Sequence, residues 1–248
     1  MSKDVVLGID VGGTYTKYGL VDKSGRIHLE DSISTGDYTK IEDFIKALHH
    51  HLNAQMDRKE AGFTLKGIGI GAPNGNYYTG SIEYPPNLVW KGKIEFVKLI
   101  EKEFGVPAVL TNDANAAALG EMLFGGAKGL DHFIMITLGT GLGSGLVVNG
   151  EMVYGNDGFA GELGHIRAVD NGRQCGCGKR GCLETYVSAT RIKRTVSADP
   201  VAPNRSGQAA VPGDWIRWLD GSTEVQRLFL ARLEEIREQG FSFFVYLF

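Results

Sequence analysis

The sequence predicts an α/β fold with two domains. Short apolar stretches of strand character alternate with segments of helical periodicity, which is typical of an α/β fold with a mixed sheet. A strand, a turn rich in glycine and threonine, and a second strand occur at residues 4–22 and again at residues 132–154. Such a repeat indicates two related domains that face each other across a cleft. Glycine supplies 35 of the 248 residues, about twice the usual ~7% share, and it clusters at these turns.

The composition is that of an ordinary globular protein, with 43% hydrophobic and 22% charged residues. A net charge of −3 gives no electrostatic reason to expect nucleic acid or an acidic membrane surface as a partner. No apolar run approaches the ~20 residues that span a bilayer, and the N-terminus has no apolar signal stretch. The few cysteines gather in one cluster, which suits a reducing compartment. We therefore expect a cytoplasmic protein.

In the first half of the chain, residues 4–10 form a short apolar run that predicts a strand. Residues 18–22 and 26–30 flank the turn Ser24-Gly25 and predict a hairpin. Residues 41–55 carry apolar side chains at helical spacing, and the glycine-rich run at residues 65–71 predicts a buried strand. These elements account for most of the first domain.

The second half continues the alternation. Residues 94–104 predict an amphipathic helix, residues 108–111 a strand and residues 115–124 an alanine-rich helix. Residues 133–138 and 145–148 predict strands on either side of a glycine-rich turn, before a second turn at Asn149-Gly150.

All three cysteines lie within eight residues, as Cys175, Cys177 and Cys182, and His165 lies ten residues upstream. Three thiols and an imidazole are the ligands of a closed tetrahedral zinc site. The alternative is ordinary buried thiols, or a disulfide with one cysteine left over. Because the number of cysteines is odd and their spacing is tight, we favour a Zn2+ site.

The first glycine turn contains Gly12, Gly13, Thr14 and Lys17, directly after Asp10 and the first strand. Backbone N–H groups in such a turn can approach phosphate oxygens, and a threonine and a lysine add a hydroxyl and a cation. Asp10 could hold Mg2+, because hard cations prefer carboxylate oxygen. A plain glycine hairpin is the alternative for this motif alone.

The second glycine turn, at residues 137–145, contains Gly139, Thr140 and Gly141. The same physical argument makes it a phosphate loop. Together, the two turns could bind the β- and γ-phosphates of a nucleotide from both sides.

Asn112 and Asp113 lie where a strand ends and a helix begins. This is the crevice position of an α/β sheet, so Asp113 is a candidate base for a substrate hydroxyl. The alternative is a helix cap, a role that Asn and Asp often fill. Glu162, His165 and Glu184 could bind a polyol, because each hydroxyl both donates and accepts hydrogen bonds. The loops around Gly75 and Asn87 could close the same pocket, although Asn87 is as well explained by a surface turn.

Five motifs, in chain order, resemble the ROK family of sugar kinases and repressors: DVGGTYTK, NDANAA, TLGTGLGSG, GELGH and CGCGKRGCLE. The resemblance covers about residues 4–196. It implies an actin/hexokinase-like (ribonuclease H-like) two-domain ATPase fold and ATP-dependent phosphorylation of a hexose, often glucose at O6. It also implies a homo-oligomer, as a dimer or tetramer. From the net charge of −3 and the lack of a long apolar run we expect no nucleic acid and no membrane as partner.

The resemblance implies that Asp113 is the catalytic base and that Zn2+ is structural. The sugar contacts implied are Asn112, Glu162, His165 and Glu184. The residues implied around ATP and Mg2+ are Asp10, Gly12, Gly13, Thr14, Lys17, Gly139, Thr140 and Gly141. The zinc ligands implied are His165, Cys175, Cys177 and Cys182.

After residue 196 the character of the chain changes, and residues 197–248 contain no lysine. Residues 197–213 predict a disordered linker and residues 224–238 a helix, and the chain ends in an apolar segment. We expect a first α/β domain at residues 1–115, the start of a second α/β domain with the zinc motif at 116–196, and an atypical tail at 197–248. Because the tail does not resemble the family, we expect an incomplete second domain, through truncation or a frameshift.

Three functions remain open at this point. A hexose kinase explains the glycine clusters and the zinc motif together. A sugar-responsive repressor of the same family would need a DNA-binding segment. A non-catalytic remnant would bind sugar and zinc without turning ATP over.

Overall fold

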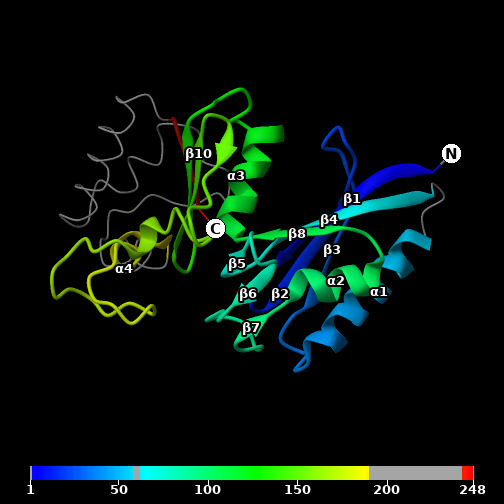
Figure 1. The fold of residues 1–248 in the computed structure, drawn as a ribbon, viewed down its shortest axis with the longest axis horizontal. Helices are drawn as coiled ribbons and strands as arrows, with labels where there is room; N and C mark the ends of the chain where they lie inside the picture. Colours follow the sequence, from blue (N-terminus) through cyan, green and yellow to red (C-terminus); the bar gives the residue numbers. More distant parts are fainter. Residues whose placement is uncertain (1, 58–61, 190–241, 248) are drawn as a thin grey trace, which may run out of the picture. The chain divides into compact units, whose positions relative to one another are not determined.

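The computed structural model describes residues 2–57, 62–189 and 242–247. The described chain divides into two compact units (Figure 1). The first unit contains residues up to Ala116 together with residues 154–159, and the second contains residues 117–153 and those from Ala160 onward. The sequence placed residues 154–159 in the second domain, but the chain returns to the first unit for these six residues.

The first unit is built on a five-stranded mixed sheet in the order β3-β2-β1-β4-β8. The strands are β1 (Lys3–Val11), β2 (Tyr15–Val21), β3 (Ile27–Ser34), β4 (Phe63–Gly71) and β8 (Ala108–Thr111). Strand β1 runs antiparallel to β2 and parallel to β4, and β4 runs parallel to β8. Three parallel strands therefore end at the same edge of the sheet.

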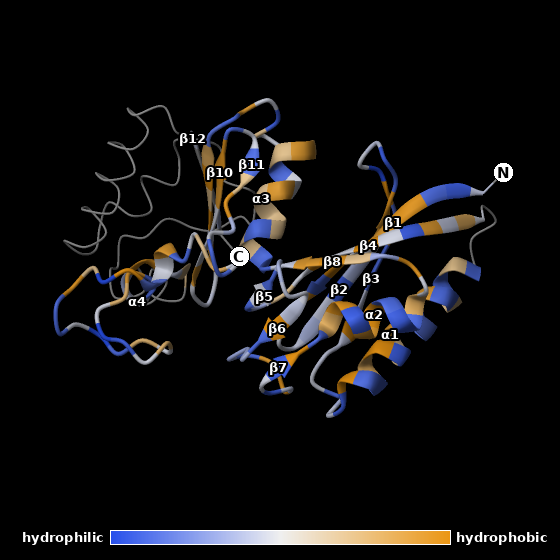
Figure 2. Ribbon diagram, viewed as in Figure 1, coloured by the Kyte–Doolittle hydropathy of each residue, from blue (hydrophilic) through white to orange (hydrophobic). Residues whose placement is uncertain are grey.

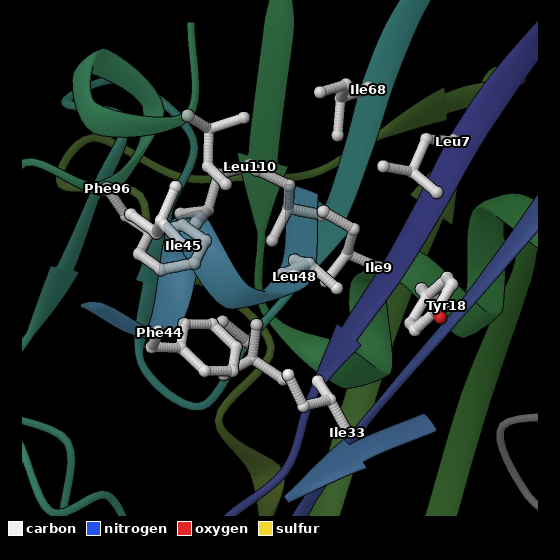
Figure 3. Packing of buried hydrophobic residues seen from close by; sticks show 14 of the residues in the cluster. Leu7, Ile9, Tyr18, Ile33, Phe44, Ile45, Leu48, Ile68, Phe96 and Leu110 are labelled. Carbon is white, nitrogen blue, oxygen red and sulfur yellow. The ribbon is translucent and has the colours of Figure 1, made fainter. Parts of the chain in front are cut away.

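Two helices, α1 (Ile41–Asp57) and α2 (Phe96–Phe104), share a hydrophobic core with this sheet. Phe44, Ile45, Leu48 and Leu52 form the buried stripe of α1, three and four residues apart as one helix face requires. The stripe is visible as alternating polar and apolar colour along the helix (Figure 2). These side chains pack with Leu7, Ile9 and other alternate residues of the sheet (Figure 3).

A small antiparallel sheet in the order β5-β6-β7 was not predicted from the sequence. Its strands are β5 (Gly75–Asn76), β6 (Ser81–Glu83) and β7 (Lys93–Ile94). Strands of two or three residues are too short to show a period. Ile94 lies in β7, and so the helix predicted at residues 94–104 begins at Phe96 instead.

The second unit holds a four-stranded sheet in the order β11-β10-β9-β12. The strands are β9 (Phe133–Leu138), β10 (Leu142–Val148), β11 (Glu151–Met152) and β12 (Ser242–Leu247). Helix α3 (Asp113–Phe124) begins in the first unit and continues into the second. Ala118 of α3 is buried in the same core as Phe133, Met135 and Val147.

The apolar C-terminal segment, for which the sequence suggested no partner, forms β12 beside β9 in parallel register. The predicted linker at residues 197–213 and the predicted helix at residues 224–238 lie outside the described residues.

The segment of the three cysteines lies between a short 3-10 helix, η1 (Leu163–His165), and α4 (Glu184–Val187). None of the helices in the described ranges is long and apolar enough to cross a membrane.

Candidate active site

The residues singled out in the sequence fall into two sets, one in each unit. The first unit contains Asp10, Gly12, Gly13, Thr14, Lys17, Gly75, Asn87, Asn112 and Asp113. The second unit contains Gly139, Thr140, Gly141, Glu162, His165, Cys175, Cys177, Cys182 and Glu184.

In the first unit, the register of the parallel strands brings the acidic residues to one edge. Asp10 near the end of β1 pairs with Gly71 at the end of β4, and Gly71 pairs with Thr111 at the end of β8. Asp113 follows Thr111 by two residues and begins α3. The carboxyl edge of parallel strands is where open α/β sheets bind ligands.

Asp10 and Asp113 both reach solvent at this edge. The protein around Asp10 removes part of its hydration, and this desolvation raises the pKa of its carboxyl group. The negative charge of Asp113 raises the pKa further, while Lys17 opposes both effects. Because the two carboxylates repel each other, they can bind a cation between them or accept the proton of a hydroxyl group, with Lys17 beside them.

The first glycine turn closes through a hydrogen bond from Gly12 N–H to the carbonyl of Tyr15, at 3.1 Å. A Cβ atom on Gly13 would lie 2.5 Å from the carbonyl oxygen of Asn87, so only glycine fits this approach. Asn87, which could equally have been a surface turn, thus packs through its backbone against the predicted phosphate loop. The side chains of Thr14 and Lys17 are exposed.

Thr16, in the same motif, was not singled out in the sequence. It is fully buried, and its hydroxyl bonds to that of Thr35 at 2.8 Å. This contact anchors the start of β2 next to the turn. The alternation of β2 predicts an inward-facing residue here, but not its partner 19 positions away.

Helix α3 is capped at its start by Asn112 and not by Asp113. Asn112 is the cap, because its Oδ1 accepts a 2.6 Å hydrogen bond from Asn115 N–H. The Asp113 carboxylate accepts a hydrogen bond from the adjacent Ala114 N–H at 2.8 Å, and its side chain stays exposed. Gly75 is buried against the carbonyl of Thr111, where a Cβ would lie 2.4 Å away. Gly75 therefore supports this junction through its backbone.

In the second unit, one ligand atom each from His165, Cys175, Cys177 and Cys182 lie within 4.8 Å of one another. All three cysteines are free thiols, which excludes the disulfide alternative. The Sγ atoms of Cys177 and Cys182 are 3.6 Å apart, and Cys175 Sγ lies 3.6 Å from His165 Nδ1. Zn–S bonds of about 2.3 Å in a tetrahedron place two sulfurs about 3.8 Å apart. The four side chains fit a tetrahedral zinc ion.

Two of the three thiols resist losing their proton in the folded chain. Burial raises the pKa of Cys175 and of Cys182, and at Cys175 the hydrogen bond to Glu184 adds to this effect. A divalent ion offsets the cost, because a coordinating thiol loses its proton. Since Nδ1 of His165 faces the thiols, its Nε2 is left for another partner.

Glu184 lies between this cluster and the second glycine turn. Its Oε1 accepts from Cys175 Sγ at 2.8 Å, and its Oε2 would lie 2.6 Å from a Cβ atom on Gly141. The turn itself closes from Gly139 N–H to the carbonyl of Gly141 at 3.1 Å, and Thr140 is exposed. The carboxylate of Glu184 thus lies next to both the cysteine cluster and the second predicted phosphate loop.

The Gly-Glu-Leu-Gly-His segment is held on β10. The Ser144 hydroxyl bonds to the carbonyl of Gly161 and accepts from Leu163 N–H at 3.2 Å. Ser144 was not singled out in the sequence. Its bonds position the segment from which Glu162 and His165 project.

The sequence matches the ROK family over residues 6–233. It is 37% identical over 195 residues to the glucokinase of Thermotoga maritima, covering 78% of this chain and 60% of that protein. It is 36% identical over 196 residues to the xylose repressor of Bacillus subtilis, covering 77% of this chain and 49% of that protein.

Solved structures agree with these matches. The ROK family glucokinase from Streptomyces griseus, in complex with glucose and AMPPNP, has a TM-score of 0.67 and 35% identity, covering 78% of this chain and 60% of that one. The ROK hexokinase from Thermus thermophilus has a TM-score of 0.71 and 27% identity, covering 98% of this chain and 82% of that one.

The solved ROK kinases have the actin/hexokinase-like fold, so the fold class predicted from the sequence is confirmed. The family match continues to residue 233, and the expectation that all resemblance ends near residue 196 is therefore wrong. The chain spans 60% of the length of the Thermotoga glucokinase and 49% of that of the Bacillus repressor. A match across most of its residues and a shared fold establish that the chain belongs to the ROK family.

Proposed function

We propose that the chain acts as an ATP-dependent hexose kinase that phosphorylates glucose, or a related hexose, at O6. The observation that carries this proposal is the pair of exposed carboxylates, Asp10 and Asp113, at the carboxyl edge of parallel strands in the first unit. The similarity to glucokinases supports it, including one that binds glucose and AMPPNP.

In the proposed mechanism, Asp113 accepts the proton of the C6 hydroxyl as that oxygen attacks the γ-phosphorus of ATP. The bond from the γ-phosphorus to the bridging oxygen breaks, and ADP leaves. Asp10 would hold Mg2+, which when bound would neutralise charge on the phosphate oxygens. The glycine turns at residues 12–17 and 139–141 offer backbone N–H groups to the phosphates. Catalysis then depends on positioning and electrostatics.

We further propose that Asn112, Glu162, His165 and Glu184 bind the sugar hydroxyls, with Gly75 and Asn87 in the surrounding loops. His165, Cys175, Cys177 and Cys182 would hold Zn2+. The ion's role is structural, because a four-ligand N/S site leaves no position for substrate. His165 would then hold the metal through Nδ1 and present Nε2 to a sugar oxygen.

The test is the variant Asp113→Asn, which keeps the shape of the side chain and removes the base. Hexose binding by calorimetry is expected to stay within about threefold of wild type. Turnover is expected to fall by about 10²–10⁴-fold, the usual contribution of a general base. Near-normal turnover would remove Asp113 from this role.

A sugar-responsive repressor is the second candidate, because the Bacillus xylose repressor matches the same part of the chain. The two functions separate in a coupled assay for ADP release with ATP and a hexose. Hexose binding without ADP release would favour a repressor, or a non-catalytic remnant, over a kinase.

A further inference from the structure

Asn115 lies two residues after Asp113 in α3, and it is 1% exposed. Its Nδ2 donates to Oγ1 of Thr111 at 3.3 Å, whereas its Oδ1 has no hydrogen-bond partner among the described residues. Burying an amide oxygen without a partner destabilises the folded state, because the oxygen gives up its hydrogen bonds to water. The amide therefore points to a role other than stability in the helix that carries Asp113.

Three hydrogen bonds close the junction between β8 and α3, and Asn115 makes two of them. Its N–H donates to Oδ1 of Asn112 at 2.6 Å, and its side chain reaches Thr111, the last residue of β8. The third bond runs from Ala116 N–H to the carbonyl of Asn112 at 3.0 Å. These bonds close a turn from Thr111 to Asn115 that has Asp113 at its centre.

The end of β4 packs directly against this turn. A Cβ atom on Gly71, the last residue of β4, would lie 3.1 Å from Cβ of Ala116 and 3.6 Å from Cα of Asp113. The carbonyl of Thr111 accepts from Ala72 N–H at 3.0 Å. The backbone of the turn is thus held between two parallel strands and the helix, and it sets the direction in which the Asp113 side chain projects.

Asp113 itself contributes little to its own orientation. Its carboxylate accepts from the adjacent Ala114 N–H at 2.8 Å, and its side chain is exposed. A bond to the next residue of the same helix constrains the carboxylate only relative to that helix. Its direction relative to the edge of the sheet depends on how α3 leaves β8, and the bond from Asn115 to Thr111 crosses that junction.

We propose that Asn115 is a positioning residue for Asp113 that acts through Thr111; this inference rests on the hexose kinase function proposed above. The buried amide ties the first turn of α3 to the last residue of β8, and so it sets the direction in which Asp113 meets the sugar hydroxyl. Without this bond the turn can shift by a fraction of an ångström. A general base displaced this far loses rate, while the hexose and ATP, held by other groups, still bind.

The test uses Asn115→Leu, which keeps the approximate size of the side chain and removes the amide, and Thr111→Val, which removes the hydroxyl. Each variant is expected to lower kcat for glucose about tenfold, with KM for glucose and for ATP within about twofold of wild type. The double variant is expected to have the kcat of either single variant, because both changes break the same bond. Thr111→Ser keeps the hydroxyl and is expected to recover most of the lost kcat.

Thermal melts separate positioning from a structural role. The double variant Thr111→Val/Asn115→Leu contains neither the unpaired amide oxygen nor one half of a broken bond, so its melting temperature is expected to equal or exceed that of wild type. Asn53→Leu is the matched control, because it makes the same change at an exposed position of α1. The kinetics of this control are expected to equal those of wild type.

Folded Asn115→Leu and Thr111→Val chains that both keep kcat within about twofold of wild type would overturn the inference. Losses of kcat that multiply in the double variant would also overturn it, because the two residues would then act separately. The same holds for a double variant whose loss of kcat comes with a lower melting temperature. A wild-type chain without kinase activity would overturn the proposed function, and this inference with it.

Discussion

The ionised carboxylate of Asp10 lowers the stability of the folded protein, because it is partly desolvated and lies near the charge of Asp113. Its folded pKa is raised above the unfolded value. The stability linked to this group is therefore fully present below the unfolded pKa and is lost as the pH rises through the folded pKa. We predict that Asp10→Asn melts at a higher temperature than wild type at pH 7, in buffer without Mg2+ or nucleotide.

The advantage of Asp10→Asn is expected to shrink on acidification and to vanish below about pH 4, the ordinary pKa of an aspartate, where the Asp10 carboxyl group is protonated in the folded and in the unfolded chain. Thermal melts from pH 3 to pH 8 measure this. Asp37→Asn, at an exposed loop position, serves as the control for a change in net charge. A variant less stable than wild type at pH 7 would contradict the repulsion inferred at this edge.

Position in the sequence was enough to single out Asp113, because an acid after a strand and before a helix lies at the carboxyl edge of the sheet. It did not decide whether Asn112 or Asp113 caps the helix. That answer depends on side-chain rotamers, and Oδ1 of Asn112 takes the cap.

At the scale of elements, the cysteine segment is the part that its local sequence specifies most completely. Its ligands are close in sequence, and the turns between them are short. We predict about one Zn2+ per chain in protein purified without chelator, and loss of that zinc in Cys182→Ser. Metal analysis of the purified proteins measures both.

Gly176→Ala is the matched control for this experiment. Gly176 lies between two of the ligands, and a Cβ atom there meets nothing within 4 Å. This variant is expected to keep its zinc. Full zinc content in Cys182→Ser, or none in wild type, would contradict the four-ligand site.

Strand β12 depends on a contact that spans 125 positions, from the Tyr246 hydroxyl to Oε1 of Glu121 at 2.7 Å. Burial and this hydrogen bond raise the pKa of Tyr246 to about 12. We predict that Tyr246→Phe lowers the free energy of unfolding by about 1 kcal/mol, the usual net value of one hydrogen bond. Urea denaturation measures this, with Tyr84→Phe as the same chemical change at an exposed site. Equal stability of Tyr246→Phe and wild type would show that β12 is not held in this way.

Periodicity predicted the long elements because their buried faces repeat over several turns or strand residues, as in α1 and β1. It did not reveal β5, β6 and β7, which have two or three residues each. The pairing of the C-terminal strand with β9 was also hidden, because register between distant segments leaves no local pattern.

For the molecule as a whole, the repeated strand–turn–strand pattern predicted the fold class, and the family match supports the ancestry over residues 6–233. What the pattern could not predict is the return of residues 154–159 to the first unit. That excursion is specified by hydrogen bonds from Asn76 to the carbonyl of Asp157 and from Tyr78 to the carbonyl of Gly155. These bonds join segments more than 70 positions apart in the chain.

The most direct test of the central claim is phosphate transfer itself. The purified chain is incubated with ATP labelled at the γ-phosphate, Mg2+ and a panel of hexoses with glucose at its head, and the labelled products are separated. We predict label on glucose or a related hexose, at O6, in wild type and its near absence in Asp113→Asn. Label that stays on ATP, or passes only to water, with a folded and zinc-loaded wild-type chain would contradict the account.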